Sequence, residues 1–306
     1  MSEENSPNES EPITFDGLGL SAPVLEALED AGYINPTPIQ ALAIPILLEG
    51  NDIIGQAKTG TGKTAAFTLP LLGRIDVSVK KPQMIVIAPT RELALQVSEA
   101  VKAYGKFIKG LRVLPVYGGQ GMMTQLNALN RGVHIVVGTP GRLIDHLKRG
   151  TLKLDAINAL VLDEADEMLR MGFIDDVETI METMPEERLT ALFSATMPAP
   201  IARIAKRFLS EPKNVRTKSK EATVETVTQS YVTVSGFRKL EALARILEVE
   251  SYDGVIVFTK TRIATTEVVE RLAERGLDAV ALNGDMNQQS RQHTIDRRSI
   301  VCCRDC

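Results

Sequence analysis

Cysteine is scarce in this chain and confined to one end. The three cysteines are Cys302, Cys303 and Cys306, among the last residues of a 306-residue sequence. Disulfide bonds between them cannot span the fold, so a disulfide-stabilised scaffold is excluded. Their spacing resembles a metal site, but no fourth ligand lies nearby and little chain is left to surround an ion. We expect an exposed tail here instead.

Long apolar segments and excess positive charge are also lacking. No run approaches the roughly 18 apolar residues of a membrane span. Residues 1–12 are acidic and polar, without the basic start and apolar segment of a secretory signal. These absences predict a cytoplasmic protein with a disordered N-terminal tail and no membrane partner. The formal net charge of −4 argues against binding nucleic acid through overall positive potential, so any such site must be local.

The length and the hydrophobic pattern predict two α/β domains. A chain of 306 residues exceeds the roughly 100–200 residues of a typical single domain. Short apolar runs alternate with amphipathic stretches such as residues 92–107, which predicts a parallel sheet with helices on both faces. We predict a first domain over 13–212, a polar linker over 213–228 and a second domain over 229–306 with a buried strand at 255–258. The apolar runs of the first domain are 84–88, 134–138, 159–162 and 191–193.

The strongest local signal is Ala-Lys-Thr-Gly-Thr-Gly-Lys-Thr at 57–64, between the apolar pair Ile53-Ile54 and a predicted helix. Such a P-loop turns its backbone amides toward phosphate oxygens at a helix N-terminus. Lys63 is predicted to neutralise the β- and γ-phosphates, and Thr64 to ligate Mg²⁺. The alternative is an ordinary Gly/Thr-rich turn. The segment also departs from the usual P-loop pattern, because Ala57 replaces the leading glycine. The nucleotide-binding candidates of the loop are Ala57, Thr59, Gly60, Thr61, Gly62, Lys63 and Thr64.

Asp163-Glu-Ala-Asp166 directly follows the apolar run at 159–162. The carboxyl ends of parallel strands share one edge with the P-loop, where open α/β sheets bind their ligands. Asp163 is predicted to hold Mg²⁺, partly through water, and Glu164 to orient or deprotonate the attacking water. Lys63, Asp163 and Glu164 are therefore the catalytic candidates. Alone, such an acidic run is more often a solvated loop or helix start, and the upstream P-loop reverses that preference.

With these motifs, Gly-Tyr-Ile-Asn-Pro-Thr-Pro-Ile-Gln at 32–40 resembles the Q motif of the DEAD-box ATP-dependent RNA helicases. The resemblance implies a RecA-like P-loop NTPase domain followed by a partial second RecA-like domain. It also implies ATP and Mg²⁺ as cofactors, RNA-stimulated ATP hydrolysis and local unwinding of RNA duplexes. Gln40 would read the adenine edge by paired hydrogen bonds, while Phe15 or Tyr33 would stack on the base. Without the P-loop, Gln40 is equally well a helix residue and Phe15 a core residue.

Three further segments match the family's RNA-contacting blocks, in order, each after a predicted strand. Small residues there let a sugar-phosphate backbone approach, while hydroxyl, amide and guanidinium groups bond phosphates and 2′-hydroxyls. Any one segment alone would be an ordinary turn or helix cap. Their order favours RNA binding without sequence preference. The RNA-binding candidates are Pro89, Thr90, Arg91, Gly118, Gly119, Thr139, Pro140, Gly141 and Arg142.

Ser194-Ala-Thr196 matches the family block that couples nucleotide state to RNA strand separation. Its hydroxyls are predicted to bond Asp166, although a Ser-x-Thr segment without the other motifs is more often a helix N-cap. Residues 143–150 and 167–173 resemble the bacterial cold-shock members of the family. That resemblance implies structured RNA as the substrate, with ribosomal precursors or RNA-decay enzymes as partners.

The resemblance ends at Asp296, and residues 297–306 do not continue the family pattern. The remaining second-domain blocks, including the arginine fingers, have no counterpart. We expect a frameshift or a truncated gene, a second sheet with an exposed edge, and slow ATP turnover, because an arginine finger is worth roughly 10³–10⁵ in rate. Two rivals stay open: a non-catalytic remnant that binds nucleotide or RNA, and a DNA helicase or unrelated P-loop ATPase.

Overall fold

The computed structural model describes residues 13–217, 227–286, 288–296 and 300–303, and the chain divides into two compact units, Met1–Ser219 and Lys220–Cys306. The first unit is built on a seven-stranded parallel sheet of order β3-β4-β2-β5-β6-β1-β7. This confirms the predicted parallel α/β fold. The strands are β1 Ile53–Gln56, β2 Met84–Ile87, β3 Val113–Val116, β4 Ile135–Gly138, β5 Ala159–Leu162, β6 Leu189–Ser194 and β7 Lys213–Arg216.

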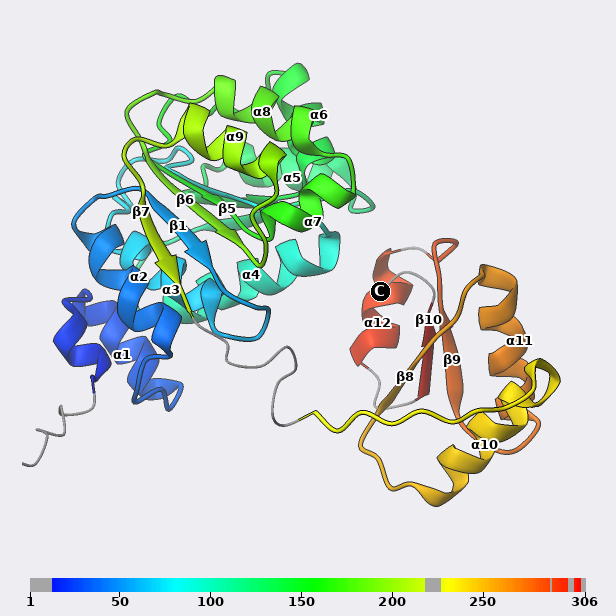
Figure 1. The fold of residues 1–306 in the computed structure, drawn as a ribbon. Coiled ribbons are helices and arrows are strands. Elements are labelled where there is room, and N and C mark those ends of the chain that lie inside the picture. Colours follow the sequence, from blue (N-terminus) through cyan, green and yellow to red (C-terminus); the bar gives the residue numbers. More distant parts are fainter. Residues whose placement is uncertain (1–12, 218–226, 287, 297–299, 304–306) are drawn as a thin grey trace, which may run out of the picture. The chain divides into compact units, whose positions relative to one another are not determined.

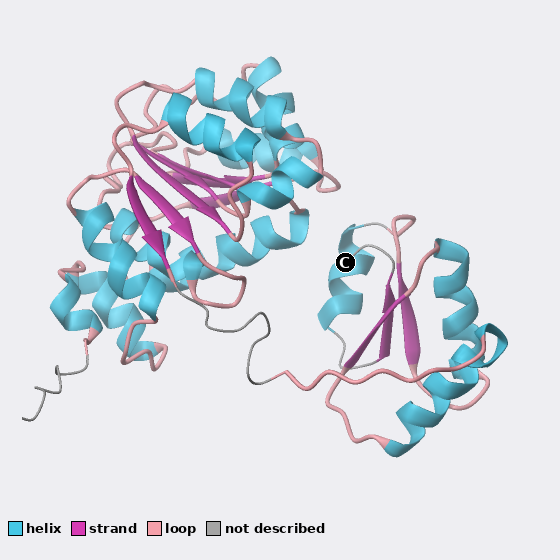
Figure 2. Cartoon of the chain, in the orientation of Figure 1, coloured by secondary structure: helices cyan, strands magenta, loops and turns pink. Residues whose placement is uncertain are grey.

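Helices cover both faces of this sheet (Figures 1 and 2). Along β2, Met84 and Val86 enter one core while Ile85 and Ile87 enter the other, as the alternation of side chains in a strand requires. The first core is covered by η1 Phe15–Leu18, α1 Ala22–Asp30, α2 Pro38–Leu48, α3 Lys63–Leu72 and α4 Arg91–Tyr104. The second core is covered by α5 Met122–Asn130, α6 Pro140–Lys148, α7 Ala165–Arg170, α8 Ile174–Glu182 and α9 Ala199–Phe208.

The first unit extends further along the chain than the sequence indicates. Residues 213–216, placed in the linker by their polarity, form β7, which pairs with β1 at the edge of the sheet. Only Val215 of this strand is buried. A polar edge strand therefore lacks the apolar run by which the central strands were identified. Residues 218–226 of the predicted linker, and the predicted tail at 1–12, lie outside the described residues.

The second unit has a three-stranded parallel sheet of order β8-β10-β9. Its strands are β8 Val255–Phe258, β9 Ala279–Leu282 and β10 Ile300–Cys303, with η2 Gly236–Arg238, α10 Lys239–Val249, α11 Arg262–Ala273 and α12 Gln288–Asp296. The expectation of an exposed tail for Cys302 is wrong. Its side chain is buried with Ala244, Leu247 and Leu272, because the apolar run at 300–303 pairs as the central strand.

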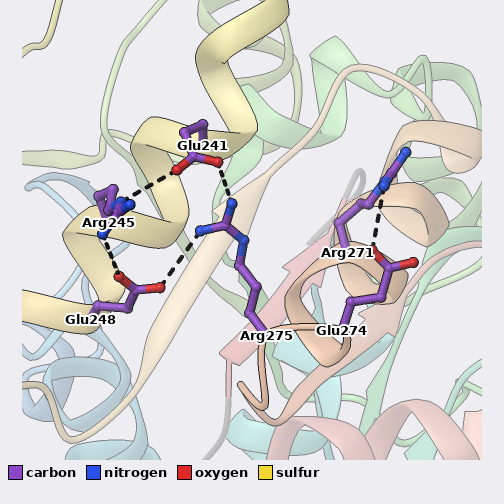
Figure 3. Close-up of polar contacts among 6 residues, drawn as sticks. All are labelled: Glu241, Arg245, Glu248, Arg271, Glu274 and Arg275. Carbon is purple, nitrogen blue, oxygen red and sulfur yellow. Dashed lines mark hydrogen bonds and ion pairs between the residues drawn. The ribbon is translucent and has the colours of Figure 1, made fainter.

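The predicted strand at 255–258 is present as β8, but the expectation that it is buried is wrong. Val255 and Val257 pack on the cluster formed with α10 and α11, but Ile256 and Phe258 on the opposite face are 59% and 69% exposed. Figure 3 shows ion pairs that join α10 to the end of α11. Arg275 contacts both Glu241 and Glu248 of α10, and Arg245 contacts the same two carboxylates. No helix in the described part of either unit is long and apolar enough to cross a membrane.

Candidate nucleotide and RNA site

The loop between β1 and α3 has the geometry of a phosphate cradle. Gly60 and Gly62 adopt positive φ angles of 78° and 90°, which glycine accepts at least cost. A Cβ added to Gly62 would also lie 2.4 Å from Gln40 Nε2, so this position requires glycine twice over. Lys63 opens α3 and is 6% exposed, and its Nζ has no hydrogen-bond partner within the described residues. A buried ammonium without a partner fits an anionic ligand.

The acidic motif lies at the end of β5. Asp163 is 2% exposed, and Oδ1 lacks a hydrogen-bond partner among the residues described. Burial raises the pKa of Asp163 to about 6, against the opposing charge of Lys63 and with the added repulsion of Glu164. Glu164 adopts a left-handed backbone with φ of 51°, a conformation that non-glycine residues adopt mainly at constrained sites.

Lys63 and Asp163 lie at the same end of the parallel sheet. In the strand order β5-β6-β1, one strand separates the two motifs, and both motifs follow the carboxyl ends of parallel strands. The charge of Lys63 lowers the pKa of Asp163, but the two side chains form no ion pair among the described residues. The unsatisfied carboxylate oxygen and the unsatisfied ammonium therefore fit a magnesium-bound phosphate between them.

The Q-motif glutamine contacts the P-loop directly. Gln40 is 5% exposed, its Oε1 accepts from the Thr37 amide at 2.8 Å, and its Nε2 donates to the Gly62 carbonyl at 3.1 Å. The two aromatic candidates differ. Phe15 is 4% exposed and belongs to the first core, whereas Tyr33 is half exposed with its ring edge-on to Tyr104. Of the two, Tyr33 has the open surface that a base could cover.

The rest of the P-loop is shaped by its own contacts. The Thr61 hydroxyl donates to the Lys58 carbonyl at 2.7 Å, and the amide of buried Ala57 donates to the Ser194 carbonyl at 3.3 Å. Thr64 follows Lys63 in the first turn of α3. Thr59 lies in the same turn as Gly60. The leading position that carries alanine instead of glycine therefore packs against the end of β6.

Asp166 links the acidic motif to the end of β6. Its Oδ2 accepts from the Thr196 amide at 3.0 Å and from the Thr196 hydroxyl at 2.8 Å, and its own amide donates to Ser194 Oγ at 3.2 Å. Although burial opposes it, hydrogen bonds from Ser194 and Thr196 lower the pKa of Asp166. The predicted contact of these hydroxyls with Asp166 is thereby confirmed. These bonds join the acidic motif at the end of β5 to the segment at the end of β6.

The three predicted RNA-contacting segments follow the adjacent strands β2, β3 and β4. Thr90 follows Pro89 and caps α4 by accepting from the Leu93 amide at 3.2 Å. Thr139 is the N-cap of α6, and Pro140 is the first residue of that helix.

The basic side chains of these segments lie near the loop after β3. The Arg91 guanidinium lies 3.4 Å from the position of a Cβ on Gly118, and Arg142 donates to the Gln120 carbonyl at 3.4 Å. Gly119 has a φ of 92°, and Gly141 has open space where a Cβ would stand.

Comparison with known proteins identifies the family. Residues 37–204, more than half of the chain, match the family described as DEAD/DEAH box helicase. The chain belongs to this helicase family. It is 58% identical over 284 residues to the ATP-dependent RNA helicase DeaD of Escherichia coli strain K12, covering 93% of this chain and 45% of that protein. With the Haemophilus influenzae protein of the same name, identity is 54% over 288 residues, covering 94% and 47%.

Solved structures of DEAD-box helicases also resemble the chain. A DEAD box protein from Methanococcus jannaschii is 38% identical with a TM-score of 0.65, covering 95% of this chain and 80% of that one. Dbp5 of Saccharomyces cerevisiae bound to RNA and ADP BeF3 is 29% identical with a TM-score of 0.85, covering 95% and 75%. These relationships confirm the RecA-like assignment. The chain spans about half the length of the curated helicases that it matches.

Sequence reasoning missed two functional candidates beside the RNA-contacting segments. Gln125 and His146 are fully buried and hydrogen-bonded to each other at 2.8 Å. Both are polar residues in amphipathic helices, where sequence pattern assigns such residues to the surface. The one available signal was the position of His146, three residues after Leu143 on the buried face of α6.

Proposed function

We propose that this protein is an ATP-dependent RNA helicase, which couples RNA-stimulated ATP hydrolysis to local unwinding of RNA duplexes. The observation that carries the proposal is that Lys63 Nζ and Asp163 Oδ1 are both buried and without hydrogen-bond partners in the described chain. Both residues follow the carboxyl ends of strands of the same parallel sheet. Lys63 would bind the terminal phosphates. Thr64 and Asp163 would hold a magnesium ion, which neutralises phosphate charge when bound.

Each remaining part has one task in this proposal. Gln40 would select adenine, with Tyr33 or Phe15 against the base, and Glu164 would orient or deprotonate the attacking water. Arg91, Gly118 and Arg142 would bind the sugar-phosphate backbone of one RNA strand. Support comes from their convergence at the ends of β2, β3 and β4, and from the similarity to Dbp5, whose structure is bound to RNA.

The experiment is steady-state ATP hydrolysis by the whole chain, with no nucleic acid, with single-stranded RNA and with DNA of the same sequence. We expect slow turnover that RNA accelerates and DNA does not. Glu164→Gln should lower the RNA-stimulated rate about 10²–10⁴-fold, the range typical of a general base, while ATP still binds. The exposed Glu186→Gln is the control.

Two other outcomes of the hydrolysis experiment would each favour one of the rival functions. Equal stimulation by DNA would replace the proposal with a DNA helicase or an unrelated P-loop ATPase. Binding of ATP and RNA without turnover would replace it with a non-catalytic nucleotide- and RNA-binding protein.

We infer a narrower role from the resemblance to the bacterial cold-shock members: action in the cytoplasm on structured RNA, with ribosomal precursors or RNA-decay enzymes as partners. The similarity to helicases named DeaD supports this role. Crosslinking of the protein to RNA in cells before and after a temperature downshift tests it. Enrichment of ribosomal precursor or decaying transcripts after the downshift is expected, and an unchanged RNA profile contradicts it.

A further inference from the structure

A buried polar relay lies behind the loop that follows β3. Gln125 of α5 and His146 of α6 are both fully buried. Gln125 Nε2 donates to the Tyr117 carbonyl at 3.0 Å and to Gln120 Oε1 at 3.0 Å. Its Oε1 lies 2.8 Å from His146 Nε2, and His146 Nδ1 lies 2.8 Å from the Thr151 hydroxyl.

The partners of this relay determine its proton positions. The Tyr117 carbonyl can only accept, so the NH₂ of Gln125 faces it and the amide oxygen faces His146. His146 must therefore carry a proton on Nε2 and donate it to Gln125. Burial lowers the pKa of His146, which favours the neutral ring. Nδ1 then accepts from the Thr151 hydroxyl at 2.8 Å, and the His146 carbonyl lies 3.1 Å from the same hydroxyl and shares its single proton. Every polar atom of the two side chains is then paired, as buried polar groups require.

The relay ends at the residues that the proposed function assigns to RNA. Two residues of α6, one helical turn apart, hold Gln120 of the loop. Arg142 donates to the Gln120 carbonyl at 3.4 Å. His146 is bonded to Gln125, which donates to the side-chain oxygen of Gln120. Gly118 and Gly119 lie between the two backbone positions that are held, Tyr117 and Gln120. The Arg91 guanidinium faces Gly118.

We propose that the Gln125–His146 pair is a positioning unit, which fixes the loop at 117–121 against α6 so that Arg142 and the Gly118-Gly119 backbone form one RNA-binding surface. This proposal rests on the proposed function. Neither side chain contacts RNA, since both are fully buried. They act through the backbone of the loop and through Arg142. The rival explanation is that the pair only stabilises the fold.

A double substitution separates positioning from stability. Gln125→Met alone leaves the His146 N–H unpaired, and His146→Leu alone leaves the Gln125 oxygen unpaired, so each single change destabilises the chain. The double variant Gln125→Met/His146→Leu replaces both partners by apolar groups, which restores much of the stability but not the bonds to Tyr117 and Gln120. His146→Gln retains an N–H at the place of Nε2 and should rescue the function. Asn127→Ala, exposed on α5, is the control.

The measurements are affinity of the whole chain for a fluorescent oligouridylate with a non-hydrolysable ATP analogue, ATP affinity, melting temperature, and amide exchange of the peptide 117–121. We expect the double variant to melt above either single variant and bind ATP normally, yet to lose about tenfold in RNA affinity, equivalent to about 1.4 kcal/mol, with faster exchange at 117–121. RNA affinity and exchange that recover together with stability would overturn the proposal.

The two proposals can fail separately. If the parent does not bind RNA at all, the proposed function fails, and the exchange of 117–121 alone decides whether the pair holds the loop. If the parent binds RNA and the double variant binds it equally well, only the positioning role fails.

Discussion

Gln40 donates a hydrogen bond from Nε2 to the carbonyl oxygen of Gly62 at 3.1 Å, which ties the Q motif to the P-loop. Its Oε1 accepts from the Thr37 amide. A glutamine amide has two N–H donors and two acceptor positions, so one donor and one acceptor remain after these contacts. Adenine presents N7 as an acceptor and N6 as a donor, whereas guanine presents two acceptors. The remaining pair on Gln40 thus matches adenine.

The first prediction concerns base selection. Gln40→Ala should weaken ATP binding about 30-fold, since two hydrogen bonds of about 1 kcal/mol each are lost, while GTP binding changes little. Competition of ATP and GTP for a fluorescent nucleotide measures both affinities. Gln96→Ala, an exposed glutamine of α4, is the control. An unchanged preference for ATP would show that Gln40 does not read the base.

The second prediction concerns Asp163 in the ligand-free chain. Its pKa in the folded chain, about 6, exceeds the ordinary pKa of an aspartate, 3.8. The folded state therefore binds the proton more tightly, and stability falls as pH rises from about 4 through 6. At neutral pH the buried charge costs on the order of 1–3 kcal/mol, from 1.36 kcal/mol per pKa unit. Asp163→Asn should remove this cost and raise the melting temperature at pH 7.5, unlike the exposed Asp175→Asn.

The same variant tests metal dependence. For the parent, ATP with Mg²⁺ at 100 times its Kd should stabilise the fold by about 2.7 kcal/mol, and chelation of the metal should reverse most of that shift. In Asp163→Asn the shift with ATP should be small and indifferent to chelation, because the proposed metal ligand is absent. Calorimetry of both proteins with ATP, before and after chelation, provides the comparison. A chelator effect of equal size in both would exclude Asp163 as the ligand.

The third prediction concerns the link between Asp166 and Thr196. Thr196→Val removes the hydroxyl that donates to Asp166 at 2.8 Å but keeps the shape of the side chain. ATP and RNA should bind nearly as well as to the parent, while RNA stimulation of ATP hydrolysis is lost. Thr179→Val, which removes an exposed hydroxyl bonded to the Asp175 carbonyl, is the control. Parallel losses of binding and stimulation would indicate general misfolding instead.

The sequence predicted those parts of the fold and the site in which local pattern and burial agree. Strands β2, β4 and β5 are wholly buried and stand out as apolar runs. The edge strand β7 has only Val215 to indicate it, and the half-exposed β8 has the composition of a buried strand. The register of neighbouring strands and the cover on each face are long-range properties, which periodicity does not contain.

The same limit applies to the site. The P-loop and the acidic motif are contiguous in sequence, so their residues could be named in advance. Gln125 and His146 are 21 positions apart in the sequence and belong to different helices. Each residue alone is an unremarkable polar side chain. Which of Phe15 and Tyr33 has exposed surface also depended on packing, because both are aromatic residues near helix α1.

The fourth prediction concerns pH and His146. Burial lowers its pKa below 6.5, despite the nearby carboxylate of Asp145 and in addition to the charges of Arg142 and Arg149. The stabilising contribution of the neutral ring is thus present above pH 6.5 and is lost as pH falls through the lower pKa of the folded state. His134 is shifted in the same direction. Urea unfolding at pH 7.5 and 5.5 should show a smaller acid loss in His146→Gln than in the parent. An equal loss would assign the acid sensitivity elsewhere.

The fifth prediction concerns the ion pairs that join α10 to the end of α11 (Figure 3). Arg275 reaches Glu241 and Glu248 of α10, whereas Arg271 pairs with Glu274 close to it in sequence. Arg275→Ala should therefore speed amide exchange in 239–249, and Arg271→Ala, the matched control, should not. High salt should shrink the difference, because added salt shortens the Debye length and so weakens the attraction between exposed charges. If both variants exchange equally fast, or if the effect survives high salt, then apolar packing around Leu247 and Leu272 holds the two helices together without these charges.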